Sequence, residues 1–381
     1  MKKIDIIEKF EDLPSPSYVC EENLLENNLK LLKKVQDEAD VNILLALKGF
    51  ALHSTFDLCK KYLKGCCASG LHEAILAKEE FGGEVHTYSP AFKEEEFDEI
   101  VSISNHVVFN SFNQLNLLKH KAIGKTSIGL RVNPEYSSVE VDLYNPCGAF
   151  SRLGITKANF DETQLENIDG LHFHALCEQN VDALQGALKN FEENFGEYLA
   201  QMKWVNFGGG HHITRDDYDV EGLITTLKEF KNRYPHLEVY LEPGEAVGWQ
   251  TGYLMATVLD IVNNGMNIAI LDTSAEAHMP DTLAMPYKAD IRGASNANEK
   301  EFTYRLGGNT CLAGDIIGDY SFDKPLEVGD KIILEDMIHY TMVKTTTFNG
   351  IKLPSIVIKK NENCYQIVNN FGYNNYKVRL S

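Results

Sequence analysis

The chain has 381 residues, of which 44% are hydrophobic and 24% charged, values typical of a globular protein rather than a disordered one. Its length exceeds what one hydrophobic core usually serves, so two domains are expected. The formal net charge of −19 argues against nucleic acid or an anionic membrane as a partner, because like charges repel. The same charge is compatible with a cationic small molecule.

The chain also lacks the sequence features of export. Asp5 and Glu8 interrupt the apolar run that a signal peptide would need, and no stretch is long and apolar enough to span a bilayer. A cytoplasmic location is therefore the default expectation. Eight cysteines, with Cys66 and Cys67 adjacent, fit neither a disulfide framework nor the CxxC pairs of a zinc site, which indicates reduced thiols.

From Asn23 onward, segments with helical periodicity alternate with short apolar runs that end in polar or glycine residues, a pattern typical of a parallel sheet. Eight strands with intervening helices predict an α/β fold, a (β/α)₈ barrel of TIM type over residues 23–250. The eight runs are Val41–Leu47, Gly65–Ala68, Glu84–Tyr88, His106–Phe109, Ser127–Val132, Gly170–His174, Trp204–Phe207 and Glu238–Leu241.

After Glu242-Pro243-Gly244 the rhythm changes. Further apolar runs follow at Tyr253–Val262, Asn267–Asp272, Phe302–Leu306 and Lys331–Leu334, without long amphipathic helices between them. Residues 251–381, joined by residues 1–22, are therefore predicted to form a second, β-rich domain of sandwich or barrel type.

Polar residues close several of the barrel strands, where barrel enzymes place their active sites. Lys48 follows the first run and His174 ends the sixth. The mostly apolar run before Lys48 would depress its pKa and favour the neutral amine needed for attack on an aldehyde. For Lys48 alone, a solvated lysine at a strand end is the favoured interpretation.

Two further strand ends change that balance. Gly208-Gly209-Gly210 ends the seventh strand, where backbone amides can approach a phosphate closely, and Glu242 ends the eighth, where it could accept a hydrogen bond from a pyridine nitrogen. A flexible turn and a structural glutamate are the alternatives. The lysine, the glycine loop and the carboxylate together predict pyridoxal 5′-phosphate as the cofactor.

A metal-dependent barrel hydrolase is the main alternative, because His172 and His174 alternate along one strand and His211-His212 follows the glycines. Against it, a hydrolase would normally add ligands from other strand ends, and Lys48 would have no task. We therefore expect no metal site.

Six short motifs then point to one family. Together they resemble the fold-type III pyridoxal-phosphate decarboxylases, which share an alanine-racemase-like barrel and include ornithine, arginine and diaminopimelate decarboxylases. The resemblance extends from Lys48 to about Asn349 and is greatest to the branch that acts on carboxynorspermidine and carboxyspermidine. The motifs are Ala46-Leu47-Lys48-Gly49-Phe50, Phe173-His174-Ala175-Leu176-Cys177-Glu178, Asn206-Phe207-Gly208-Gly209-Gly210-His211, Glu242-Pro243-Gly244-Glu245, His278-Met279-Pro280-Asp281 and Asn309-Thr310-Cys311-Leu312-Ala313-Gly314-Asp315.

The resemblance implies a role for each matching residue and a homodimer with shared active sites. In that pattern Lys48 carries the cofactor covalently, His174 stacks on its ring and Glu242 faces the ring nitrogen. The glycines Gly208, Gly209 and Gly210 and also Tyr340 contact the phosphate. Cys311 is delivered from the partner subunit to protonate the product carbanion.

The sequence departs from the family pattern in places. Glu245 stands where relatives usually have arginine, Leu312 where many have an acidic residue, and Cys177 where relatives often have serine. A carboxylate at position 245, with Asp281 and Asp315 from the second domain, is expected to bind the ammonium groups of a cationic polyamine.

The implied reaction is decarboxylation of carboxynorspermidine or carboxyspermidine to norspermidine or spermidine. A diaminopimelate or ornithine decarboxylase is an alternative within the family. A racemase of the same fold is disfavoured because racemases prefer an arginine where this chain has Glu242. A pyridoxal-phosphate carrier with a bare barrel is disfavoured by Cys311 and Asp315 in the second domain.

Overall fold

The computed structural model describes residues 5–285 and 287–381, and the chain divides into two compact units. One unit is Glu26–Val247, and the other combines Met1–Leu25 with Gly248–Ser381. Among the helices of the described residues, none is both long and apolar enough to cross a bilayer.

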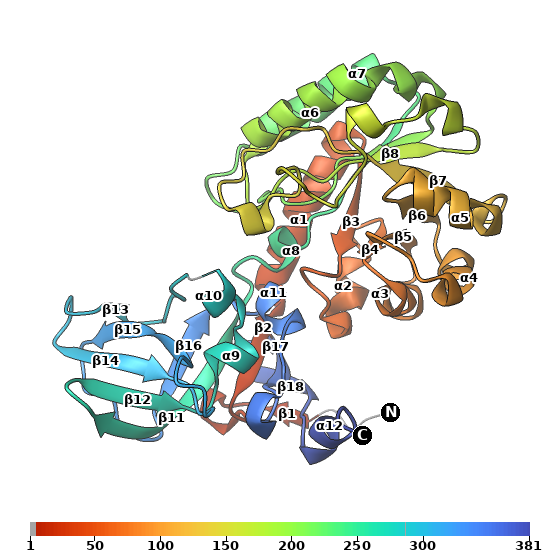
Figure 1. The fold of residues 1–381 in the computed structure, drawn as a ribbon. Coiled ribbons are helices and arrows are strands. Elements are labelled where there is room, and N and C mark those ends of the chain that lie inside the picture. The colour runs from red at the N-terminus through yellow and green to blue at the C-terminus, as the bar shows by residue number, and fades with distance from the viewer. Residues whose placement is uncertain (1–4, 286) are drawn as a thin grey trace. The chain divides into compact units, whose positions relative to one another are not determined.

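In the first unit, described without gaps, eight parallel strands close into a barrel in the order β10-β3-β4-β5-β6-β7-β8-β9 (Figure 1). This confirms the predicted (β/α)₈ fold. Each strand is short and buried, and each lies in one of the eight apolar runs. The strands are β3 Asn42–Ala46, β4 Gly65–Ala68, β5 Glu84–Tyr88, β6 His106–Phe109, β7 Ser127–Arg131, β8 Gly170–His172, β9 Trp204–Asn206 and β10 Glu238–Leu241.

Helices connect most successive barrel strands and bury one apolar face against them, whereas only short 3₁₀ turns lie between β7 and β8. In α6 the buried face carries Leu184, Leu188 and Phe191, which recur three or four residues apart. Side chains cap helix starts, as where Ser111 accepts a hydrogen bond from the Gln114 amide. The helices are α1 Glu22–Ala39, α2 Phe56–Cys59, α3 Leu71–Leu76, α4 Glu94–Ile103, α5 Phe112–Ala122, α6 Val181–Phe195, α7 Val220–Arg233 and α8 Glu245–Gly248.

A tryptophan fills the barrel interior at its amino-terminal end. Trp204 opens β9 and donates its indole N–H to the Ser127 hydroxyl, 2.9 Å away. Gly129 and Gly170 on the two preceding strands leave room for the ring, since a Cβ there would lie 2.3 Å and 2.1 Å from Trp204 atoms. Stacked imidazoles of His86 and His106 continue this layer, with ring centroids 3.8 Å apart. The end of the barrel opposite Lys48 is thus closed by packed rings.

The second unit is built on a mixed sheet, which within the described residues has ten strands. The order is β1-β18-β17-β2-β11-β12-β14-β15-β13, and β16 also pairs with β11 (Figure 1). The strands are β1 Asp5–Ile7, β2 Ser17–Glu21, β11 Gly252–Asn263, β12 Asn267–Leu271, β13 Ser295–Asn296, β14 Phe302–Gly307, β15 Ile316–Phe322, β16 Lys331–Glu335, β17 Ser355–Asn361 and β18 Cys364–Asn369.

The N-terminal segment is integral to this sheet. β2 runs antiparallel to β11 and parallel to β17, so residues near the chain start pair with residues far along it. Val19, Tyr253 and Val357 meet in one buried cluster of this sheet. Short helices follow the strands, α9 Ala275–His278, α10 Asp281–Ala284, α11 Tyr340–Val343 and α12 Tyr373–Lys377.

Candidate active site

Lys48 lies two residues beyond the end of β3, at the carboxyl end of the barrel. Its side chain stays accessible to solvent, yet protein atoms surround it closely enough that desolvation lowers its pKa. Arg131 lowers the pKa further, while Cys67, Glu242 and Cys177 oppose the shift. A lysine that is reachable and has a lowered pKa provides more of the neutral, nucleophilic amine.

Glu242 follows β10 and is only 12% exposed. Asn206 donates from Nδ2 to Glu242 Oε1 at 2.7 Å, and His172 Nε2 lies 3.5 Å from Glu242 Oε2. Burial lowers the pKa of His172 well below its usual value, and the charges of Arg131 and Lys48 act in the same direction. The carboxylate is therefore oriented by the Asn206 amide and lies beside a neutral imidazole.

The three glycines form a tight loop after β9. Gly208 and Gly210 have left-handed backbones, with φ of +71° and +84°, and a Cβ at Gly208 would lie 2.8 Å from His174 atoms. The Gly208 N–H donates to Asn206 Oδ1 and the Gly209 N–H to His174 Nδ1. The Gly210 N–H makes no hydrogen bond to the described residues. Among these three amides, Gly210 has the N–H best placed to serve an anion.

His174 is held in one tautomer by this loop. Its Nδ1 accepts the Gly209 N–H at 2.9 Å, so the ring proton resides on Nε2. Desolvation lowers the pKa of His174 well below its usual value, and Lys48 and Arg131 reinforce the shift. Arg131 Nη2 also donates to the His174 backbone carbonyl at 3.3 Å. The imidazole is thus neutral and fixed in place beside the glycines.

Two residues of this site were not predicted from the sequence. Arg131 is buried at the end of β7, and its guanidinium carbon lies 4.6 Å from the centroid of the Tyr88 ring. Asn206 is buried at the end of β9 and joins Glu242 to the glycine loop. Each lies one residue before the end of a predicted apolar run, so the rule that selected Lys48 and His174 could have selected them as well.

The structure places two predicted residues, Cys311 and Asp315, in one loop of the second unit. The Cys311 thiol is exposed, and its backbone N–H donates to Asn349 Oδ1 at 2.7 Å. Asp315 is only 3% exposed and accepts hydrogen bonds from the Thr310 hydroxyl at 2.6 Å and the Ala275 amide at 2.7 Å. Asp315 therefore anchors the loop to the start of α9, and its oxygens are already engaged.

The other predicted substrate-binding carboxylates also have protein partners. Within the barrel unit, Glu245 Oε2 lies 3.5 Å from Nε2 of the buried His212. Within the second unit, Asp281 at the start of α10 pairs with Lys344 at 2.7 Å, and the Lys344 ammonium lies 5.4 Å from the centroid of the Tyr340 ring. Tyr340 thus shares its surroundings with a lysine that the sequence did not single out.

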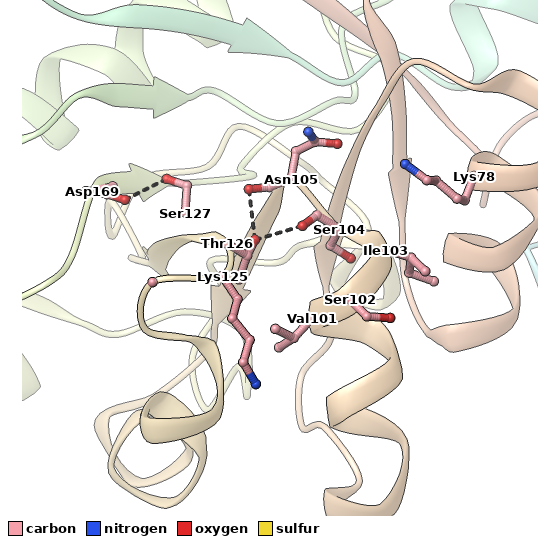
Figure 2. Close-up of a pocket in the computed structure, with 11 residues that line it drawn as sticks. Lys78, Val101, Ser102, Ile103, Ser104, Asn105, Lys125, Thr126, Ser127 and Asp169 are labelled. Atoms are coloured by element: carbon pink, nitrogen blue, oxygen red, sulfur yellow. Dashed lines mark hydrogen bonds between the residues drawn. The ribbon is translucent and has the colours of Figure 1, made fainter.

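A cavity of about 480 Å³ lies at the opposite, amino-terminal end of β7, where Figure 2 shows Asn105, Thr126, Ser127 and Asp169. The Thr126 hydroxyl donates to the carbonyl of Asn105, and Ser127 donates to Asp169 at 2.9 Å. Barrel chemistry takes place at the carboxyl ends of the strands, so this hollow is separate from the Lys48 site.

No group of three or more His, Cys, Asp and Glu side chains among residues 5–285 and 287–381 could hold a metal ion. His211 is buried instead, and desolvation lowers its pKa to about 4, partly opposed by the carbonyls of Gly208 and Phe207. His174 after β8 and His211 after β9 thus act as neutral side chains within the barrel.

A family model described as the C-terminal sheet domain of pyridoxal-dependent decarboxylases matches residues 17–338. The chain belongs to this decarboxylase family. It is a pyridoxal-phosphate enzyme that removes CO₂ from its substrate, and the metal-dependent hydrolase interpretation is wrong.

Several relatives align with nearly the whole length of this chain. A carboxynorspermidine/carboxyspermidine decarboxylase of Campylobacter jejuni is 52% identical over 97% of this chain and 99% of its own. A carboxyaminopropylagmatine decarboxylase of Synechocystis is 45% identical over 99% and 98%. The crystal structure of a Campylobacter jejuni carboxynorspermidine decarboxylase with norspermidine superposes with a TM-score of 0.91, at 51% identity over 96% and 100% of the two chains.

The residues at the barrel mouth fit the family's cofactor. Lys48 supplies an accessible amine of lowered pKa, Gly210 an N–H that donates to none of the described residues, and Glu242 an oriented carboxylate. An aldehyde, a phosphate and a protonated pyridine need these three kinds of partner.

Proposed function

We propose that this enzyme decarboxylates carboxynorspermidine or carboxyspermidine to norspermidine or spermidine in polyamine biosynthesis. The observation that carries the proposal is the 52% identical decarboxylase of that specificity, which aligns over almost the entire chain. Diaminopimelate decarboxylases share the fold, but that of Helicobacter pylori is only 16% identical. The barrel site and the acidic residues are consistent with a cationic substrate.

In the proposed site, the barrel residues bind and orient the cofactor. Lys48 Nζ would hold it covalently, and Glu242 would accept a hydrogen bond from the ring nitrogen. When bound, pyridoxal phosphate supplies an electron sink that accepts the pair left behind as CO₂ departs. The Asn206 amide holds the Glu242 carboxylate through a hydrogen bond to Oε1, so the ring nitrogen would meet an oriented acceptor.

The remaining cofactor contacts follow from the same geometry. His174 presents a neutral ring fixed through Nδ1, suited to packing against a flat aromatic group. Gly208, Gly209 and Gly210 would enclose the phosphate, with the Gly210 N–H as donor. Tyr340 would add its hydroxyl to the same phosphate.

Protonation of the product carbon is assigned to Cys311. Its exposed Sγ–H is free to meet a substrate carbon, and Asn349 fixes the backbone that carries it. We propose that a cytoplasmic homodimer delivers this thiol to the site of the partner subunit.

Substrate selection is assigned to Glu245 and Asp281, which would bind separated ammonium groups of the polyamine chain. Asp315 would contribute to binding indirectly, by holding the Cys311 loop through Thr310. Truncating one member of a desolvated charge pair typically costs about 2–5 kcal/mol, so Glu245→Ala should lower kcat/KM by roughly 30-fold or more.

The 45% identical relative that acts on carboxyaminopropylagmatine supports a second candidate substrate. Agmatine ends in a planar guanidinium rather than an ammonium, and a carboxylate can bind either group. The charge of the site therefore does not distinguish carboxynorspermidine or carboxyspermidine from carboxyaminopropylagmatine, and a comparison of turnover does.

The deciding experiment compares CO₂ release from carboxynorspermidine, carboxyspermidine, carboxyaminopropylagmatine, meso-diaminopimelate and ornithine by the purified holoenzyme. The proposal expects the highest kcat/KM for carboxynorspermidine or carboxyspermidine. Equal or better use of diaminopimelate would overturn the polyamine assignment. A preference for carboxyaminopropylagmatine would select the second candidate.

A further inference from the structure

An internal ammonium group lies against one of the proposed substrate-binding carboxylates. Lys344 caps the C-terminus of α11, and its Nζ contacts both oxygens of Asp281, Oδ1 at 2.7 Å and Oδ2 at 2.9 Å. The same Nζ lies 5.4 Å from the centroid of the Tyr340 ring. The Lys344 ammonium therefore lies between a carboxylate and an aromatic face.

These surroundings are the ones that recognise a primary ammonium in general. A carboxylate supplies charge and acceptors, and an aromatic face attracts a cation within about 6 Å of its centroid. The other two proposed carboxylates differ. Glu245 faces the buried His212, and Asp315 accepts from backbone amides and a hydroxyl of its own loop. The partner of Asp281 is a flexible primary amine.

We propose that the Lys344 ammonium occupies a subsite for one ammonium group of the polyamine, and that the substrate displaces it on binding. Lys344 is then a specificity-determining residue that acts as a built-in competitor. This inference rests on the proposed function, because it requires a substrate with an ammonium group remote from the reacting carbon.

The exposure of the pair makes displacement feasible. The Lys344 side chain is 41% exposed and Asp281 19%, so the lysine can swing into solvent while the carboxylate stays in place. Ion pairs of this exposure shift an equilibrium by no more than about five-fold. Displacing Lys344 therefore lowers the affinity for a substrate by no more than this factor when a substrate ammonium takes its place. A substrate that lacks such an ammonium leaves the Lys344–Asp281 pair intact.

The test is calorimetric titration of the holoenzyme with norspermidine, a triamine that carries the required ammonium groups. Lys344→Met should tighten binding by about three- to five-fold, because the competitor is gone. Asp281→Asn should abolish this gain, so that adding Lys344→Met to Asp281→Asn changes the affinity no further. Lys344→Arg keeps a cation at the site and should not show the gain.

Lys359→Met is the matched control, since Lys359 pairs with Glu21 at 2.7 Å in the same unit and should leave norspermidine affinity unchanged. The inference alone would be overturned if folded Lys344→Met bound norspermidine no more tightly than the parent enzyme while the parent enzyme released CO₂ from carboxynorspermidine. The proposed function would then still stand. Absence of norspermidine binding and of this turnover in the parent enzyme would overturn the proposed function, and the inference with it.

Discussion

Asn206 is the residue whose replacement tests the barrel site most finely, because it makes two different hydrogen bonds. Its Nδ2 donates to Glu242 Oε1 at 2.7 Å, and its Oδ1 accepts the Gly208 N–H at 2.8 Å. The residue is 1% exposed, so water cannot replace either bond without rearrangement. Asn206→Ala removes both bonds, whereas Asn206→Asp removes only the first.

The expected losses follow from these contacts. A buried hydrogen bond to a charged group contributes about 1.5–3 kcal/mol, and a stranded buried N–H costs about 1–3 kcal/mol. Asn206→Ala should therefore lower the free energy of unfolding by roughly 3–5 kcal/mol, similarly at pH 5 and pH 8. Asn206→Asp keeps an acceptor for Gly208 but sets a second carboxylate against Glu242. Its loss should shrink as the pH falls, because one shared proton relieves the repulsion.

The assay is urea unfolding followed by fluorescence and far-UV circular dichroism at both pH values. Asn361→Asp is the control, since Asn361 is exposed and its Oδ1 accepts from the Asn363 amide, a role that aspartate retains. The control should change stability by less than about 0.5 kcal/mol. An Asn206→Asp variant as stable as the parent protein at pH 8 would refute the reasoning.

Three further predictions concern the barrel core and the dimer. Gly170→Ala should lower the free energy of unfolding in urea by about 1–3 kcal/mol, because its Cβ would lie 2.1 Å from the Trp204 indole that fills the barrel. Gly314→Ala is the control and should not lower it, because a Cβ at Gly314 would have no atom within 4 Å. Burial, reinforced by His86, lowers the pKa of His106 to about 2, so the unfolded chain binds the proton first as the pH falls. Stability should therefore decline from about pH 6.5 downward, by roughly 3 kcal/mol at pH 4, and His106→Leu should flatten that slope; an unchanged slope would contradict this role. Mixed Lys48→Ala and Cys311→Ala subunits should regain about a quarter of parental activity if a two-fold dimer shares its sites, and no recovery despite proven exchange would place both residues in one chain.

The barrel could be predicted because each strand is a short apolar run with a clear end. The same ends located Lys48, His174 and Glu242, since strand order puts the carboxyl ends of all eight runs on one face. The contacts that these groups make with residues of other strands could not be predicted. Arg131 reaches the His174 carbonyl from a neighbouring strand, and no local pattern encodes that contact.

The second unit was harder to predict because its pairings are long-range. β2 lies between β11 and β17, and local periodicity says nothing about partners more than two hundred residues away. The same limit applies to the acidic residues. The sequence marked Asp281 and Asp315 as carboxylates, but it could not show that a lysine covers the first and that a hydroxyl and amides saturate the second.

The most direct test of the central claim is to locate the cofactor on the chain. The holoenzyme is reduced with borohydride, digested and analysed by mass spectrometry. The account predicts one reduced pyridoxyl-phosphate adduct, on the peptide that contains Lys48, and loss of that adduct together with the visible absorption in Lys48→Ala. An adduct on a different lysine, or an unchanged visible spectrum in the variant, would contradict the assignment of the active site to the barrel mouth.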